Sequence, residues 1–205
     1  MRLIGMLDSP YVRRVAISLS LLDLPYVHEP VSVFRHYDAF AAVNPVVKAP
    51  TLVTDDGVVL MDSSLIIEHA ERLADPRLSL TPPGITEHAH AQRVVGLALA
   101  ACEKSVQIVY ERELRPAEKQ HQPWVDRVRG QLLAAYRLLE AEIAAHEGWL
   151  AAERPLQADI STAVAWTFSR KLVPEIARDE DFPALAAFTS RAEALPAFRA
   201  SPHEG

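Results

Sequence analysis

A proline-rich break divides this chain into two parts of different character. Four residues that interrupt helices and strands lie within residues 75–85: Pro76, Pro82, Pro83 and Gly84. Before the break, short β-rich runs alternate with helical patterns, whereas after it we find helical patterns only. The 205 residues suffice for two small domains. We therefore predict one domain over residues 1–77 and a second over residues 86–205.

The first domain is predicted to mix strands and helices. Apolar runs typical of strands occur at four places: Leu3–Leu7, Tyr26–Val27, Pro50–Val53 and Val58–Met61. Helical patterns follow Ser9 and cover Tyr37–Val43 and Ser64–Leu73. An Asp-Gly turn between the last two apolar runs predicts an antiparallel hairpin. The predicted order is β-α-β-α-β-β-α, an α+β domain that begins with a parallel crossover.

The second domain is predicted to be an all-α helical bundle. Long amphipathic patterns cover four ranges: Ala89–Leu114, Pro123–His146, Asp159–Leu172 and Pro183–Leu195. Successive helical segments with no convincing strand between them are typical of helix bundles.

Composition excludes several classes of protein. Hydrophobic residues make up 49% of the chain and charged residues 23%, as in an ordinary globular protein. The formal net charge of −6 and the lack of a basic run disfavour nucleic acid as a partner. No apolar stretch reaches the ~20 residues of a membrane span, and the N-terminus lacks a signal-peptide pattern. With Cys102 as the only cysteine, we expect no internal disulfide and a cytoplasmic location.

The first strand-to-helix turn carries the clearest chemical signal. Ser9 lies between the apolar run and a helix that has Pro10 in its first turn, where a missing N–H is harmless. Free N–H groups and the helix dipole favour an anion at this position. Thiol–disulfide enzymes place a reactive cysteine here, but this chain has a hydroxyl, with Val12 in place of a second cysteine. The turn therefore suits a thiolate that another molecule supplies, although a simple helix-capping role for Ser9 is the alternative.

Four short motifs, in this order along the chain, resemble those of the cytosolic glutathione S-transferases. They are Ser9–Arg14, Asn44–Pro50, Asp62-Ser63 and Ala158-Asp159-Ile160. The resemblance covers essentially the whole chain and is closest to bacterial members that use a serine. It implies a thioredoxin-like N-terminal domain followed by an all-α helical C-terminal domain.

The resemblance also implies roles for individual residues. Ser9 would donate a hydrogen bond to the glutathione sulfur, and Pro50 would be a cis-proline. Ala49 would pair through its backbone with the cysteinyl part of glutathione. Asp62 and Ser63 would bind the γ-glutamyl end, although both could instead serve as helix caps. Lys48 is a candidate partner of the glycyl carboxylate, with a solvated surface charge as the alternative.

The implied activity is that of a glutathione transferase. Glutathione would be a co-substrate that attacks a small electrophile or a peroxide in detoxification, with no other cofactor and no metal. Tyr110 and Arg112, with Arg115, are the polar candidates for the electrophile pocket; a salt-bridge cluster is the alternative. The family also implies a homodimer. Two other readings stay open: a glutathione-dependent thiol/disulfide oxidoreductase, and a non-catalytic binding or regulatory protein with this fold.

Two positions depart from the family pattern. Val47 stands where glycine is common, so the loop before Pro50 is expected to follow a different path. Leu156 stands where a Ser or Thr usually caps the following helix, so Gln157 or Asp159 must cap it differently. Arg13 and Arg14, in the first motif, are expected to be solvent-facing or domain-interface charges, with a direct role in the site as the alternative.

Overall fold

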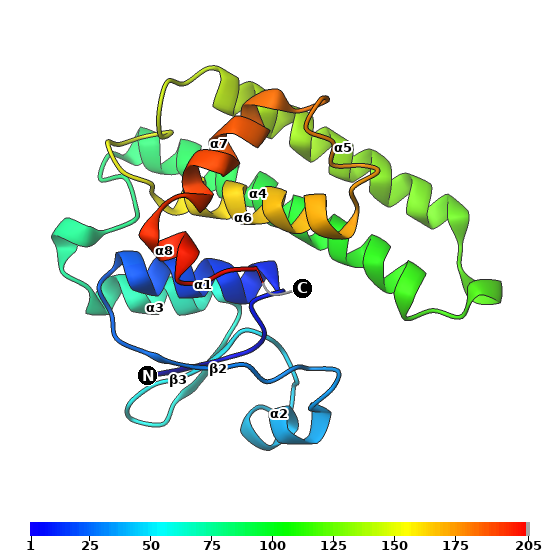
Figure 1. The fold of residues 1–205 in the computed structure, drawn as a ribbon. Coiled ribbons are helices and arrows are strands. Elements are labelled where there is room, and N and C mark those ends of the chain that lie inside the picture. Colours follow the sequence, from blue (N-terminus) through cyan, green and yellow to red (C-terminus); the bar gives the residue numbers. More distant parts are fainter. Residues whose placement is uncertain (204–205) are drawn as a thin grey trace. The chain divides into compact units, whose positions relative to one another are not determined.

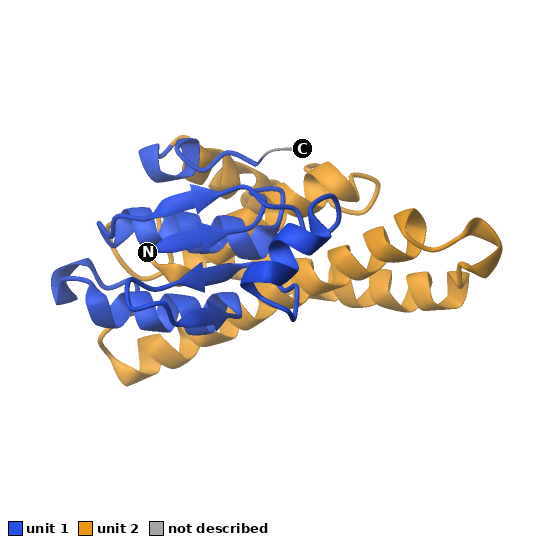
Figure 2. Ribbon diagram, turned by 90° about the horizontal axis from the view of Figure 1, so that it is seen from below, with its two compact units in different colours: residues 1–80, 195–205 blue, residues 81–194 orange. Residues whose placement is uncertain are grey.

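The structure, a computed structural model, describes residues 1–203 of the chain. It forms two compact units, shown in different colours in Figure 2. The first contains Met1–Leu80 together with the segment from Leu195 onward, and the second contains Thr81–Ala194. This division differs from the expected one at its C-terminal end, because the last segment belongs to the first unit.

The first unit has the predicted order of strands and helices. Its elements are β1 (Arg2–Ile4), α1 (Pro10–Leu21), β2 (Val27–Glu29), α2 (Tyr37–Val43), β3 (Thr51–Val53), β4 (Val59–Met61), α3 (Ser63–Leu73), the short 3-10 helix η1 (Pro76–Leu78) and α8 (Pro196–Arg199). The parallel crossover and the hairpin are both confirmed, since β1 pairs parallel with β2 and β3 pairs antiparallel with β4. Strands β1, β3 and β4 are shorter than the predicted runs, β2 extends beyond its predicted run to Glu29, and α8 was not predicted.

The sheet fixes which loops lie next to one another. Its four strands, within the described residues, are ordered β2-β1-β3-β4. Ile4 of β1 lies opposite Thr51 of β3, which in turn lies opposite Met61 of β4. The register therefore places three strand ends at the same end of the sheet: the end of β1, the start of β3 and the end of β4. Figure 1 shows α1 and α3 side by side on one face of these strands.

Helix α8 joins the first unit through Arg13 of α1. The Arg13 side chain is buried, its Nε donates to the Ser201 carbonyl at 2.8 Å, and its guanidinium lies 5.7 Å from the centre of the Phe198 ring. The expectation that Arg13 faces solvent is therefore wrong. These contacts explain why the C-terminal segment belongs to the first unit.

The second unit is all-helical, as predicted. It contains α4 (Ile85–Glu113), the short 3-10 helix η2 (Ala117–Lys119), α5 (Gln122–Ala144), α6 (Gln157–Leu172) and α7 (Pro183–Glu193). Trp166, buried in α6, packs against Tyr136 of α5 and against Phe182, with ring centres 5.0 and 5.5 Å apart. No helix within residues 1–203 is both long and apolar enough to cross a membrane.

Candidate active site

Ser9 caps the first helix of the first unit. It is the N-cap residue of α1, with an extended backbone, and its Oγ accepts a hydrogen bond from the Val12 N–H at 3.4 Å. Pro10 is the first helical residue, as expected. A hydroxyl has one proton and two lone pairs, so accepting from Val12 leaves the Ser9 proton available to an anion. Capping and anion binding are therefore compatible at this residue.

A hydrogen-bonded loop leads into β3, and its Ala49–Pro50 peptide is cis, as expected. The buried Asn44 donates from Nδ2 to Thr51 Oγ1 at 2.8 Å, and its Oδ1 accepts from the Val46 N–H at 3.0 Å. Thr51 Oγ1 in turn donates to the Lys48 carbonyl at 2.8 Å. These bonds hold the loop from both ends. Asn44 begins the second of the four sequence motifs, but the sequence alone predicts no role for it.

Val47 adopts a conformation that favours glycine. Its φ is +51°, in the left-handed region where a β-branched residue is rare. Valine takes the left-handed φ itself here, and the path of the loop relative to other family members stays a prediction. The loop is strained at this residue, by about 1–2 kcal/mol for a left-handed L-residue.

The N-terminus of α3 begins immediately after β4. Asp62 is its N-cap residue, with φ of +71°, and its Oδ1 accepts from the Ser64 N–H at 2.9 Å. Ser63, the first helical residue, is buried. This end of the helix therefore combines an exposed carboxylate, two hydroxyls and the positive end of a helix dipole.

Arg14 of α1 lies against the two serines that begin α3. It is 2% exposed, and its Nη1 donates to Ser63 Oγ at 2.9 Å and to Ser64 Oγ at 3.1 Å. The expectation that Arg14 faces solvent is wrong. Sequence reasoning missed this contact because Ser63 lies 49 residues away along the chain.

Gly5 brings the first turn and the loop before β3 into close approach. Its φ is +140°, and a Cβ placed on it would lie 2.6 Å from Val12 Cγ2 and 3.2 Å from Ala49 Cβ. A side chain at this position would therefore push the two segments apart. Asp62 follows Met61, which pairs with Thr51, so the start of α3 lies at the same end of the sheet. The structure thus collects the Ser9, Ala49–Pro50 and Asp62-Ser63 motifs at one place.

Comparison with known proteins agrees with this geometry. Residues 3–78 match the family model of the glutathione S-transferase N-terminal domain, and residues 100–196 match that of the C-terminal domain. The chain is also 30% identical over 200 residues to a maleylacetoacetate isomerase of Pseudomonas aeruginosa, covering 91% of this chain and 88% of that protein. The chain belongs to the glutathione S-transferase family.

Solved structures of the family have the same fold. A glutathione S-transferase of Methylobacterium radiotolerans, in complex with glutathione sulfonate, superposes with a TM-score of 0.91 at 26% identity and covers 100% of this chain and 95% of its own. A glutathione transferase family member of Pseudomonas fluorescens, with bound glutathione, gives 0.83 at 27% identity, with 100% and 99% covered. This chain is an enzyme of the glutathione transferase type.

Three further candidate residues of this transferase are Lys48, Tyr110 and Arg112. Lys48 is exposed, and its role towards glutathione stays a prediction. Tyr110 and Arg112 lie on α4 in the second unit, where Arg112 donates to Glu175 at 2.6 Å. Their role in an electrophile pocket also stays a prediction. The single cysteine, Cys102, is buried in the same helix.

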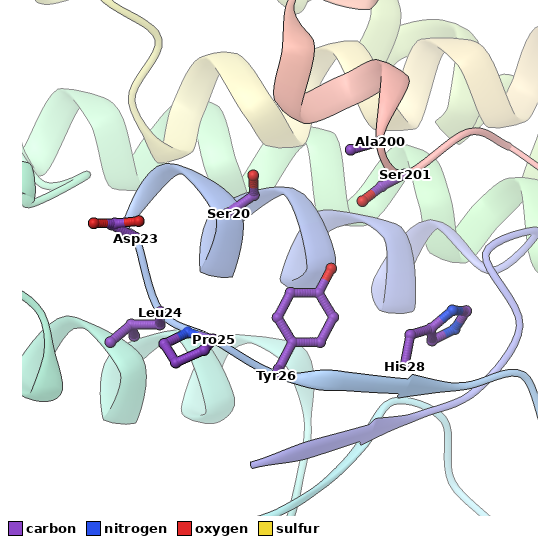
Figure 3. A pocket seen from close by; sticks show the side chains of 8 residues that line it. All are labelled: Ser20, Asp23, Leu24, Pro25, Tyr26, His28, Ala200 and Ser201. Carbon is purple, nitrogen blue, oxygen red and sulfur yellow. The ribbon is translucent and has the colours of Figure 1, made fainter.

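A separate cavity of the transferase, about 660 Å³ in volume, lies in the first unit. Figure 3 shows the Tyr26 hydroxyl and the Ser201 side chain directed into it, and Asp23 and Pro25 also line it. Burial raises the pKa of Tyr26, and its hydrogen bond with Ser201 acts in the opposite direction. None of the predicted site residues lines this cavity.

Proposed function

We propose that this enzyme binds glutathione in its first unit and that Ser9 stabilises the bound thiolate. One observation carries the proposal: the sheet register and the close approach at Gly5 gather three motifs that suit three parts of one tripeptide. The serine turn suits the sulfur, the backbone of Ala49 suits the cysteinyl part, and the Asp62-Ser63 turn suits the γ-glutamyl end.

The role of Ser9 follows from the pKa of a thiol. A free thiol has a pKa of ~8.5, so only a few per cent is ionised at neutral pH. A hydrogen bond to a charged group contributes ~1.5–3 kcal/mol, which corresponds to about one to two pKa units. The Ser9 proton and the positive end of α1 would supply this stabilisation without a general base. The thiolate would then form a carbon–sulfur bond with a small electrophile, either displacing a leaving group or adding to a double bond with uptake of a proton. With a peroxide it would instead take one oxygen and release the alcohol, after which a second glutathione gives the disulfide and water.

The Asp62-Ser63 turn offers complementary groups for the γ-glutamyl end. That end carries an ammonium, which would pair with the Asp62 carboxylate, and a carboxylate, which would accept from Ser63 and from the N–H groups of α3. Glutathione acts as a co-substrate in this scheme, and neither a metal nor a further cofactor takes part.

The sharpest test of glutathione binding is Asp62→Asn. Asparagine caps helices as well as aspartate does and also tolerates a positive φ, so the turn should be preserved while the charge is lost. Calorimetry should show glutathione affinity lowered by about 1–3 kcal/mol, with an unchanged melting temperature. Asp23→Asn is the matched control, because Asp23 is also exposed at a positive φ of 55°. It follows the C-terminal end of α1, whereas the proposed site includes the N-terminal end of that helix. Equal affinity in Asp62→Asn and the wild type would contradict the assignment.

The isomerase relative favours a second candidate activity. A glutathione thiolate can add to a conjugated double bond, allow rotation, and leave again, so that glutathione is regenerated. We propose this as the alternative use of the same site, on the strength of the 30% identity over 91% of the chain. An assay with maleylacetoacetate separates the two activities: isomerisation needs glutathione but does not consume it, whereas conjugation consumes it.

We also propose a cytoplasmic homodimer that acts in detoxification. The first unit carries exposed apolar side chains in and next to β4 and on α3, which we together call the β4–α3 face. Its members are at least 37% exposed: Val58, Val59, Met61, Leu65 and Leu73. A second copy of the chain is the partner we propose for this face.

A further inference from the structure

The second unit contains a cavity that the proposed glutathione chemistry does not use. Its volume is about 300 Å³, at the lower end of the range of small-molecule sites. Its walls come mainly from the first turns of α4, the first residues of α6 and the loop that joins α5 to α6, so we call it the α4–α6 cavity. All of its lining residues belong to the second unit, and none of them is a predicted site residue.

The floor of the α4–α6 cavity is apolar and buried. Ala91 and Val94 of α4, Leu150 of the loop and Leu156 before α6 line it, and each is at most 8% exposed. Water beside such side chains lacks hydrogen-bond partners, so an apolar group that displaces it is favoured. The floor therefore suits the apolar body of a small molecule.

Two exposed histidines, His90 and His146, form a polar part of the lining. Glu142 of α5 holds both rings: its Oε2 lies 2.7 Å from His90 Nε2, and its backbone carbonyl lies 2.8 Å from His146 Nδ1. Carboxylate and carbonyl oxygens accept, so in a neutral ring the bonded nitrogen carries the proton and the other nitrogen keeps a lone pair. These other nitrogens, His90 Nδ1 and His146 Nε2, make no hydrogen bond within residues 1–203.

The spacing of the two rings suits one donor group that contacts both. Their centres are 6.3 Å apart and their planes are inclined by 30°. A nitrogen that donates to an imidazole over ~2.9 Å lies about 4 Å from the centre of that ring. One such nitrogen could therefore join two rings up to about 8 Å apart, which is more than the spacing found here.

The charges around the α4–α6 cavity favour a cation. Glu87 and Asp159 line it, whereas no lysine or arginine of the described chain does so. The nearby Arg93 is paired with the Glu142 carboxylate. Asp159 already accepts from two backbone N–H groups, which leaves its negative charge in place. An ammonium group, with three donors and a positive charge, matches this lining better than a neutral hydroxyl or a carboxylate does.

We propose that the α4–α6 cavity binds small organic ammonium ions with an apolar body. The body lies on the floor formed by Ala91, Val94, Leu150 and Leu156, and the ammonium donates to His90 Nδ1 and His146 Nε2. This site is separate from the glutathione site and does not depend on it.

The test compares three probes with the same aromatic body and different head groups. Phenethylamine carries an ammonium, phenethyl alcohol a hydroxyl, and phenylacetate a carboxylate. Calorimetry at about pH 8, where an imidazole is ordinarily neutral, would measure their dissociation constants on the full chain. Phenethylamine should bind about tenfold or more tightly than phenethyl alcohol, and phenylacetate should bind more weakly than either.

Three variants locate the site. His146→Phe keeps a ring at an exposed position but removes the nitrogen, so the preference for the amine over the alcohol should fall to about twofold. Ala91→Leu fills the floor and should weaken the binding of both probes about tenfold or more. His88→Phe changes a histidine of the same helix that does not line the cavity, and it should keep wild-type affinities. Circular dichroism checks that each variant is folded.

Each contrary result overturns a stated part of the proposal. Equal affinities for the amine and the alcohol, or tighter binding of phenylacetate, would exclude an ammonium site. Wild-type affinities in His146→Phe would remove the histidine from the site, even if Ala91→Leu does not fold. The same losses in His88→Phe as in His146→Phe would show that the effect is not local. No binding of phenethylamine at millimolar concentration would mean that the cavity takes no such ligand.

Discussion

At the scale of single residues, the Ser9 hydroxyl combines a structural role with the chemical role that we propose for it. Its lone pair accepts from the Val12 N–H, which satisfies one free donor of α1. Its proton remains available to a ligand, and we propose that it donates to the sulfur of glutathione. The 3.4 Å separation is long for a hydrogen bond, so the cap leaves the hydroxyl freedom to turn towards a ligand.

Replacing Ser9 by alanine should separate these roles. Loss of the cap should lower the free energy of unfolding by about 1 kcal/mol. Loss of the donor should raise the pKa of the bound glutathione thiol by about one to two units, with little change in affinity. The thiolate absorbance of the complex, followed against pH, measures the pKa. Ser20→Ala, at the exposed C-terminal end of α1, is the control. If the pKa of the bound thiol is unchanged in Ser9→Ala, Ser9 acts only as a helix cap.

Val47 offers a test of backbone strain. Its φ of +51° costs a β-branched residue about 1–2 kcal/mol, whereas glycine adopts this region freely. Glycine also adds conformational entropy to the unfolded chain, by roughly 0.5–1 kcal/mol. Val47→Gly should therefore be neutral or stabilising by up to about 1 kcal/mol in urea denaturation. Val46→Gly, at a neighbouring exposed position that is not left-handed, should destabilise the protein. The same loss in both variants would show that Val47 is unstrained.

At the scale of the element, Asp159 supplies the hydrogen-bond acceptor that the N-cap residue of α6 lacks. Leu156 is the N-cap residue and has no side chain that could accept a hydrogen bond. The buried Asp159 carboxylate instead accepts from the Leu156 N–H at 2.8 Å and from the Leu150 N–H at 2.9 Å. Burial raises the pKa of Asp159, and these hydrogen bonds act against the rise. The carboxylate thereby fastens the preceding loop to the helix.

Removing that carboxylate should destabilise the protein strongly. Asp159→Ala leaves two buried N–H groups without an acceptor, at about 1–3 kcal/mol for each. Asp159→Asn keeps one acceptor oxygen and should lose less. Urea denaturation of both variants, read by circular dichroism, measures the difference. A loss below about 1 kcal/mol in Asp159→Ala would mean that water replaces the carboxylate.

The elements also show what the sequence could predict. Periodicity and an Asp-Gly turn predicted the helices and the hairpin, because both signals are local. The burial of Arg13 and Arg14 was missed because α1 is buried almost all round over its first ten residues. On such a helix the apolar pattern does not tell which polar side chains are inside. Their partners, Ser201 and Ser63, lie 188 and 49 residues away.

The candidate site shows the same limit. Each motif could be found in the sequence, and the resemblance supplied their roles. Their meeting point depends on the register of Ile4, Thr51 and Met61 across three strands, which no local pattern specifies. Helix α8, four residues long, was missed because a single turn has no periodic signal.

At the scale of the whole molecule, the β4–α3 face has the exposed apolar side chains that favour association with another protein chain. Strand β4 is at one edge of the sheet, and an edge with apolar side chains tends to associate. Leu65, at 59% exposed, and Leu73, at 53%, extend the apolar surface along α3. Together with Val58, Val59 and Met61, they are the exposed apolar side chains that a partner would cover.

If a second copy covers this face, light scattering should find a dimer at micromolar concentration. Stable interfaces bury about 800 Å² for each partner, with a few central apolar side chains supplying most of the free energy. Leu65→Glu would place a charge in the centre of the face and should shift the protein to a monomer, without loss of helix content. Leu172→Glu, at a 39% exposed leucine of α6 in the second unit, should leave the mass unchanged. A monomeric wild type would contradict the proposed dimer. A Leu65→Glu variant that stays dimeric would show that the β4–α3 face is not its interface.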